Sequence, residues 1–187
     1  MAQWFLYFLF YSFAGYLLEK AFARLIRSPN QVRKCFLLLP LCPVYGLAMT
    51  AVLAVIPEGS GPLRQIFLGG AICTAVEYLV HLFYERAFAV QFWNYSGLKG
   101  HIQGRICPQF ALIWGILSAA AVWWIQPFAM RLAALAPPEV PYGLWLLLAA
   151  DCVFTTALLR YCRDPEQLAL RAAFAQIRAS SQSDTSL

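Results

Sequence analysis

The sequence predicts an all-α membrane protein: a polytopic helical bundle with about five transmembrane helices, its N-terminus outside and its C-terminus in the cytoplasm. The first observation behind this prediction is composition. Of the 187 residues, 61% are apolar and only 12% are charged, so a soluble domain would have too little polar surface to cover its core. The second is the spacing of apolar runs, and the third is the uneven distribution of basic residues between them. We therefore expect a multi-pass protein of the cell membrane, with the lipid bilayer as its main partner.

Five apolar runs approach the roughly 20 residues that cross a bilayer as a helix. The second run contains Pro40 and Pro43 near its start, which remove backbone donors and predict a kink or irregular first turns. The residues after Pro127 could lie flat on the membrane as a short amphipathic helix. We expect one transmembrane domain over residues 1–163 and a polar, partly disordered cytoplasmic tail over residues 164–187. The expected helices occupy residues 4–24, 35–56, 65–84, 109–126 and 142–161.

The basic residues orient this bundle. Five lie in the first loop between helices, three in the third and four in the tail, against one each in the second and fourth loops. Cytoplasmic loops carry an excess of Lys and Arg, so the richer side is expected to be inside. The same rule explains the net charge of +5 without nucleic acid, which we do not expect as a partner. The six cysteines contain no CxxC pair and are interpreted as reduced thiols.

Three polar residues lie on one face of the third expected helix. Glu77, His81 and Glu85 are spaced four residues apart, so each stands about one turn from the next. A carboxylate at membrane depth costs about 3 kcal/mol, so this face should meet protein or a polar cavity. One interpretation is a proton or cation relay, or the acidic wall of a substrate cavity that opens to the cytoplasm; the other is a buried contact that only locks helices together. The spacing also suits zinc or manganese, but H-E-x-x-H is absent and we expect no metal.

Glu19 lies near the cytoplasmic end of the first helix. A salt bridge with Lys20 or Arg24 would explain it at the interface. If the first and third helices pack together, Glu19 instead joins the acidic cluster, with Arg33 and Arg105 as cationic counterparts from the adjoining loops. The result would be a polar site on the inner side of the membrane.

Other polar and small residues carry weaker predictions. Asp151, about halfway along the last helix, is interpreted as a buried hydrogen-bonding group or a secondary site residue. Gly69, Gly70 and Gly115 are interpreted as points of close helix contact. The stretch from Glu85 to Cys107 has no spanning pattern and is expected to be an interfacial or re-entrant loop.

Four local patterns stand out in residues 4–128. They are Phe10-Tyr11-Ser12-Phe13-Ala14-Gly15 followed by Glu19; Cys42-Pro43-Val44-Tyr45-Gly46; Glu77 with Glu85; and Trp93-Asn94-Tyr95-Ser96 leading to Gly104-Arg105-Ile106-Cys107. Together these patterns resemble the ABC-transporter permease family of the CmpB type, which has multi-pass relatives in animals. Leu39 stands where the family usually has Gly, and Asn94 where it usually has Asp, which removes a negative charge.

The resemblance implies a permease-like transport component with a polar site in the cytoplasmic half of the bundle. The chain has no G-x-x-x-x-G-K-[ST] motif, so an ATPase would be a separate subunit; a homo-oligomer is the other partner to consider. The positions marked by the resemblance are Gly15, Glu19, Arg33, Pro40, Pro43, Tyr45, Gly46, Glu77, Glu85, Trp93, Tyr95, Ser96, Gly104 and Arg105.

Two other function classes stay open. One is a membrane-embedded enzyme that acts on lipid headgroups, with Arg33 and Arg105 binding phosphate and an acid serving as base. No nucleophile motif supports it, so we expect no catalytic residue and no cofactor. The other is a non-catalytic accessory subunit whose charges only hold helices together. The candidate substrate or ion site residues are Glu19, Arg33, Glu77, His81, Glu85, Trp93, Tyr95 and Arg105.

Overall fold

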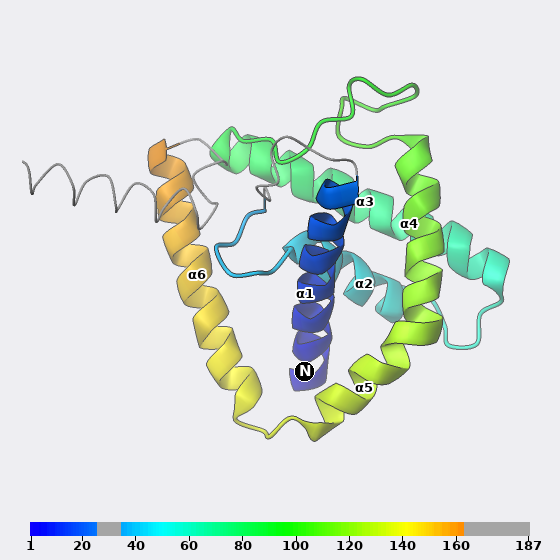
Figure 1. Cartoon of the computed structure of the whole chain (residues 1–187), viewed down its shortest axis with the longest axis vertical. Helices are drawn as coiled ribbons and strands as arrows, with labels where there is room; N and C mark the ends of the chain where they lie inside the picture. Colours follow the sequence, from blue (N-terminus) through cyan, green and yellow to red (C-terminus); the bar gives the residue numbers. More distant parts are fainter. Residues whose placement is uncertain (26–34, 163–187) are drawn as a thin grey trace, which may run out of the picture.

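A computed structural model of the chain describes residues 1–25 and 35–162, and this part of the chain is all-helical, as predicted (Figure 1). It contains five helices, one of which is composite: α4 runs without interruption through a π-helical turn, η1, into α5. The bounds are α1 Ala2–Leu25, α2 Pro43–Val55, α3 Pro62–Phe88, α4 Pro108–Ala120, η1 Ala121–Ile125, α5 Gln126–Leu135 and α6 Val140–Cys162.

Three of these helices are long and apolar enough to cross a membrane: Pro62–Phe88, Pro108–Leu135 and Val140–Arg160. The helix α1 has 24 residues, which at 1.5 Å per residue gives about 36 Å, enough to cross a hydrocarbon core. The apolar helix α2 has only 13 residues. Three of the five expected transmembrane helices are thus supported by both length and composition in the described chain. That α1 and α2 also cross the membrane, and how the bundle is oriented in it, stay predictions.

The second expected helix, residues 35–56, is shorter than predicted. Residues 35–42 are irregular, and α2 begins only at Pro43. Proline at the first helical position costs nothing, because that N–H has no partner within the helix in any case. Pro40 lies within the irregular segment, where the missing donor interrupts no helix. The irregular start predicted for this helix is confirmed, and it covers residues 35–42.

The fourth expected helix, residues 109–126, is longer than predicted, because the residues after Pro127 continue it instead of forming a short helix of their own. The chain stays helical to Leu135, and the residues after Pro127 pack on α1. The Tyr11 hydroxyl donates a hydrogen bond of 2.8 Å to Gln126 Oε1, and the rings of Phe10 and Phe128 lie 6.1 Å apart. The helix accommodates Pro127 because the π-helical turn comes directly before it and locally changes the hydrogen-bond register.

Glycine residues allow close contact within two helix pairs, α1 with α2 and α3 with α4. A Cβ atom added to Gly46 of α2 would lie 2.5 Å from the Phe8 carbonyl oxygen of α1. One added to Gly70 of α3 would lie 2.8 Å from the Ala111 carbonyl oxygen of α4, and one added to Gly115 would overlap the Ile66 carbonyl. The close contacts predicted at Gly70 and Gly115 are confirmed, whereas the contact at Gly46 was not predicted. Together they fix how α1 meets α2 and how α3 meets α4.

Asp151 attaches α6 to the irregular segment. Its Oδ1 accepts a hydrogen bond from the Leu38 N–H at 3.3 Å, and its Oδ2 accepts one from the Leu39 N–H at 3.0 Å. The Thr155 hydroxyl donates to Oδ1 at 3.1 Å. Asp151 therefore supplies acceptors to backbone donors that a continuous helix would have used internally.

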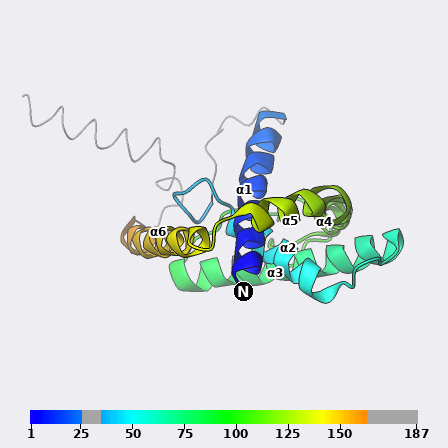
Figure 2. The same ribbon diagram turned by 90° about the horizontal axis from the view of Figure 1, so that it is seen from below.

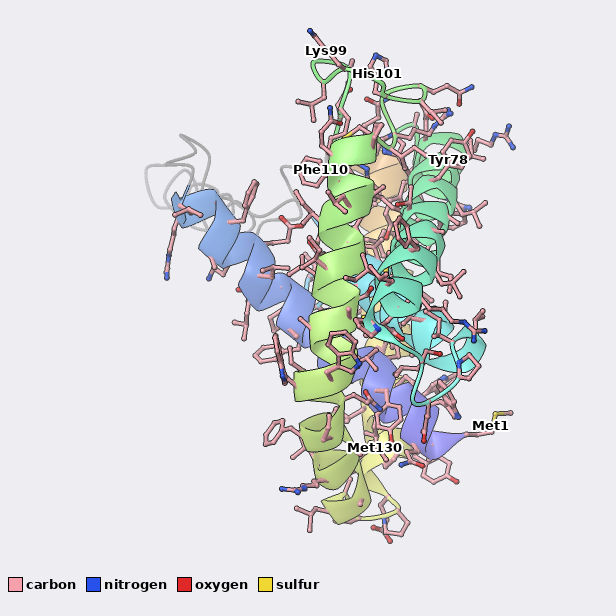
Figure 3. The ribbon with its side chains drawn as sticks, turned by 90° about the vertical axis from the view of Figure 1, so that its right-hand side faces the viewer. Met1, Tyr78, Lys99, His101, Phe110 and Met130 are labelled. Carbon is pink, nitrogen blue, oxygen red and sulfur yellow. The ribbon has the colours of Figure 1, made fainter. Side chains whose placement is uncertain are left out.

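The helices are arranged as a flattened layer that α1 crosses obliquely, with the C-terminal end of α1 projecting from it (Figure 2). In Figure 1, α6 stands across the molecule from α4, and the connection between α5 and α6 closes one end. The loop over residues 89–107 lies at the opposite end: Figure 3 shows Lys99 and His101 at its tip, far from Met130. The region between α1, α2, α3 and α4 holds the candidate site.

Candidate functional site

A cavity of about 320 Å³ lies between α1, α2, α3, α4 and the loop 89–107. Its size falls at the lower end of the range for small-molecule sites. Its walls are mostly apolar and aromatic, and two of its lining residues are acids, Glu19 of α1 and Glu77 of α3. Among the described residues that line it, none is Lys, Arg or His.

Glu77 is buried, with 6% of its surface exposed, and both of its oxygens have a hydrogen-bond donor. The Tyr95 hydroxyl donates to Oε1 at 2.7 Å, and the Trp114 indole N–H donates to Oε2 at 3.0 Å. The donors come from the loop and from α4, so three separate elements meet at this carboxyl group. Both donors are neutral, so they orient the carboxyl group without supplying a positive charge.

Glu19 is held in a similar way from the other side of the cavity. The Tyr45 hydroxyl of α2 donates to Glu19 Oε1 at 2.7 Å. The Tyr45 ring meets the Trp114 ring edge to face, with 5.6 Å between centroids. The two acids are thus joined through a Tyr45–Trp114 pair, and Glu19 lines the same cavity as Glu77. The route differs from the expected packing of the first helix on the third, because α1 packs mainly on α2. The Lys20 ammonium lies over the Tyr16 ring at 5.2 Å instead of pairing with Glu19.

The loop 89–107 folds back toward the bundle and contributes Trp93 and Tyr95 to the cavity wall. The Tyr95 N–H donates to the Gly104 carbonyl at 2.7 Å, which closes the loop. Gly104 has φ of 71°, a left-handed conformation that glycine adopts without strain. Burial, and secondly the neighbouring Glu77 carboxylate, raises the pKa of Tyr95, so its phenol stays protonated and keeps donating.

Asn94 shapes this loop without carrying charge. Its Oδ1 accepts a hydrogen bond from the Ser96 N–H at 2.8 Å and another from the Ser96 hydroxyl. This is the local side-chain-to-backbone turn that Asn and Asp both form. The amide thus makes the same turn that an aspartate would make at this position.

Glu85 and Arg105 pair with each other outside the cavity. Arg105 donates to Glu85 Oε2 from Nε at 3.0 Å and from a terminal nitrogen at 2.5 Å, and its guanidinium lies 5.4 Å from the centre of the Tyr78 ring. The hydrogen bonds from Arg105 to Glu85 raise the pKa of the guanidinium further. Eight residues along an α-helix turn a side chain by about 80°, which explains why Glu85 diverges from Glu77.

His81 is also separate from the cavity. It is buried, and its ring meets the Trp93 ring edge to face at 5.0 Å between centroids. Trp93 in turn donates from its indole N–H to the Arg105 carbonyl at 3.0 Å. Arg33, the remaining candidate, lies outside the described residues. Within residues 1–25 and 35–162, no three His, Cys, Asp or Glu side chains are grouped so that they could hold a metal ion.

Sequence reasoning from composition and spacing missed Trp114, and it reached Tyr45 only through the family resemblance. Trp114 lies in a long apolar run, where an indole is as consistent with lipid contact as with a buried hydrogen bond. The available signal was the acid itself: a buried carboxylate needs donors, and indole N–H groups are among the few that α4 offers.

The comparisons identify the family. A family model described as "Putative ABC-transporter type IV" matches residues 6–157. The chain belongs to this family. The match extends from α1 into α6 and includes every described residue that lines the cavity, so the site of this family member lies wholly within the shared region. No match was found among curated proteins or among solved structures.

Proposed function

We propose that this membrane protein is a permease-like component of a transport system and that the cavity lined by Glu19 and Glu77 is its solute site. The observation that supports the proposal is the convergence of Glu19 and Glu77 on one cavity from two different helices. Apolar residues of similar size would hold helices together at least as well as buried acids. Acids inside a membrane protein generally mark solute or proton pathways.

The irregular backbone around the cavity supports the same function. Cys35, Phe36 and Cys42 of the segment before α2 line the cavity, as do Ala121 and Ile125 of the π-helical turn. Interrupted helices at solute sites are a recurring feature of transporters, because non-helical backbone is tolerated in a membrane where it lines a cavity. Such segments can change conformation without unfolding a complete helix.

The position of the cavity also fits an opening to the cytoplasm. The loop 89–107 provides part of the wall, and the positive-inside rule predicts that this loop lies inside the cell. Energy for transport would come from a separate ATPase subunit, in keeping with the family description. A stoichiometric ATPase that co-purifies with the full chain in mild detergent would support this arrangement.

The transport proposal is tested by comparing solutes in cells that lack the chain with cells that express it. Wild type, Glu77→Gln and Glu19→Gln are expressed to equal levels, with Glu58→Gln as a matched control because Glu58 lies in an exposed turn outside the cavity. We expect the wild type and Glu58→Gln to restore solute uptake or export, and the two cavity variants to lower its rate at least about tenfold. Solute levels that do not differ between any of these strains would refute the transport function.

A further inference from the structure

We propose that the cavity takes an organic cation, an amine or quaternary ammonium group attached to an apolar body. This inference rests on the proposed solute site and names the chemical class of its ligand. Two features of the cavity carry it: the charge of its polar groups and the character of its walls.

The polar groups of the cavity favour a positive charge. Glu19 and Glu77 are its two acids, and their hydrogen-bond donors in the described chain are neutral: two tyrosine hydroxyls and one indole. The described lining residues include no cation that could neutralise either acid. The nearby Arg105 is bound to Glu85 and lies outside the lining. A cationic ligand would therefore supply the charge that the described walls lack.

The walls favour an organic cation over a metal ion. The rings of Tyr45, Trp114 and Tyr95 stand next to the two acids, and Trp93 and Phe92 extend the aromatic surface. Aromatic faces attract ammonium groups, most strongly where water is excluded, and they also cover an apolar body. A hard metal ion would need several oxygen ligands, whereas no group of three metal-binding side chains occurs in the described chain.

An anion or a neutral solute fits less well. An anion would meet two acids without a described basic side chain in the wall. A neutral apolar solute would leave the acids unused, and it would bind equally well to a cavity in which they were replaced by amides. The preference for charge is therefore the property to measure.

The experiment uses two ligands of nearly identical shape and the purified full chain in lipid nanodiscs. Benzyltrimethylammonium carries a positive nitrogen, and neopentylbenzene carries a carbon in its place. Binding is measured from tryptophan fluorescence, to which Trp93 and Trp114 of the cavity contribute, and it is checked by calorimetry. We expect the cation to bind at least about tenfold more tightly than its neutral isostere, since desolvated ammonium groups interact strongly with carboxylates and aromatic faces.

Two variants assign that preference to the acids. Glu77→Gln and Glu19→Gln should each lower the affinity for benzyltrimethylammonium at least about fivefold and leave the affinity for neopentylbenzene unchanged. Glu58→Gln should bind both ligands as the wild type does. Testing both acids keeps the inference falsifiable if one variant fails to fold. Equal binding of the two ligands by the wild type, or a full cation preference in both cavity variants, would overturn it.

The outcome can be separated from that of the transport test. Transport that depends on Glu77 but carries only neutral or anionic solutes would refute the cation inference and leave the transport function in place. Conversely, the purified chain could show a cation preference that depends on Glu77 while the solute content of cells is the same with and without the chain. That result would support the cation inference and refute the transport function.

Discussion

Replacing Asp151 by alanine should detach α6 from the irregular segment before α2. The Asp151 carboxylate accepts hydrogen bonds from the Leu38 and Leu39 N–H groups at 3.3 and 3.0 Å. Alanine removes both acceptors, and the low-dielectric surroundings offer the two N–H groups little water as a substitute. The Thr155 hydroxyl also loses its acceptor but can turn to a carbonyl of its own helix.

The size of the effect follows from these bonds. A fully buried donor left without a partner costs about 1–3 kcal/mol. The Leu38 and Leu39 N–H groups are part-buried, so the two together predict a loss near the lower end of about 2–6 kcal/mol in the free energy of unfolding. Asp151→Asn keeps one acceptor oxygen and should lose about half as much. Leu147→Ala is the matched control: its side chain lies on the exposed face of α6, and its effect should stay within about 0.5 kcal/mol.

The assay has a thermodynamic and a local readout. Unfolding in mixed detergent micelles, extrapolated linearly to zero denaturant, gives the free energy. Alkylation of Cys35 and Cys42, both buried in the folded chain, reports whether residues 35–42 have opened. An Asp151→Ala variant that unfolds within about 0.5 kcal/mol of the wild type and is alkylated no faster would refute the reasoning.

Three further predictions use other parts of the structure. Gly115→Leu should cost about 1–3 kcal/mol by forcing α3 and α4 apart, whereas Gly143→Ala, where an added Cβ meets nothing within 4 Å, should cost little in the same unfolding assay. The pKa of Tyr95 is raised in the folded chain, so the contribution of its protonated phenol to stability is present below pH 10 and is lost as the pH rises further. Above pH 10, the free energy of unfolding should therefore fall more steeply in the wild type than in Tyr95→Phe, by up to about 1.4 kcal/mol per pH unit. Parallel slopes in the two proteins would contradict this. A membrane-impermeant maleimide on intact cells should label Gly61→Cys and spare Gly97→Cys, because the positive-inside rule places the turn before α3 outside and the loop 89–107 inside; the reverse pattern would invert the predicted orientation.

The sequence predicted the helices well because apolar runs and prolines act locally. Pro40 and Pro43 indicated the irregular entrance to α2, and the composition of each run indicated a helix. The continuation of α4 into α5 was not predictable in the same way. A proline after a spanning run usually marks an end, and no residue pattern announces a π-helical turn that accommodates it.

The candidate site was only partly predictable, because it depends on how the helices pack. Helical spacing placed Glu77 on a protein-facing side, but its donors Tyr95 and Trp114 lie 18 and 37 residues away along the chain. The meeting of Glu19 with the same cavity depends on the close approach of α1 and α2 at Gly15 and Gly46. Sequence spacing defines a face of one helix, whereas the identity of the opposite wall follows from contacts at such small residues.

Asn94 separates the shape of the site from its charge. Its side-chain oxygen makes the turn with Ser96 that an aspartate would make, so the loop can bring Tyr95 to Glu77 without an acid at position 94. The charge of Glu85 is already balanced, because its carboxylate pairs with the Arg105 guanidinium. Of the acids that the sequence singled out, Glu19, Glu77 and Asp151 have described hydrogen-bond partners that are all neutral, and only Glu19 and Glu77 line the cavity. The chemistry of this site depends on what balances the Glu19 and Glu77 carboxyl groups, a proton or a bound cation. Benzyltrimethylammonium and neopentylbenzene distinguish these possibilities, because a cavity whose acids take only protons shows no preference for the ammonium compound.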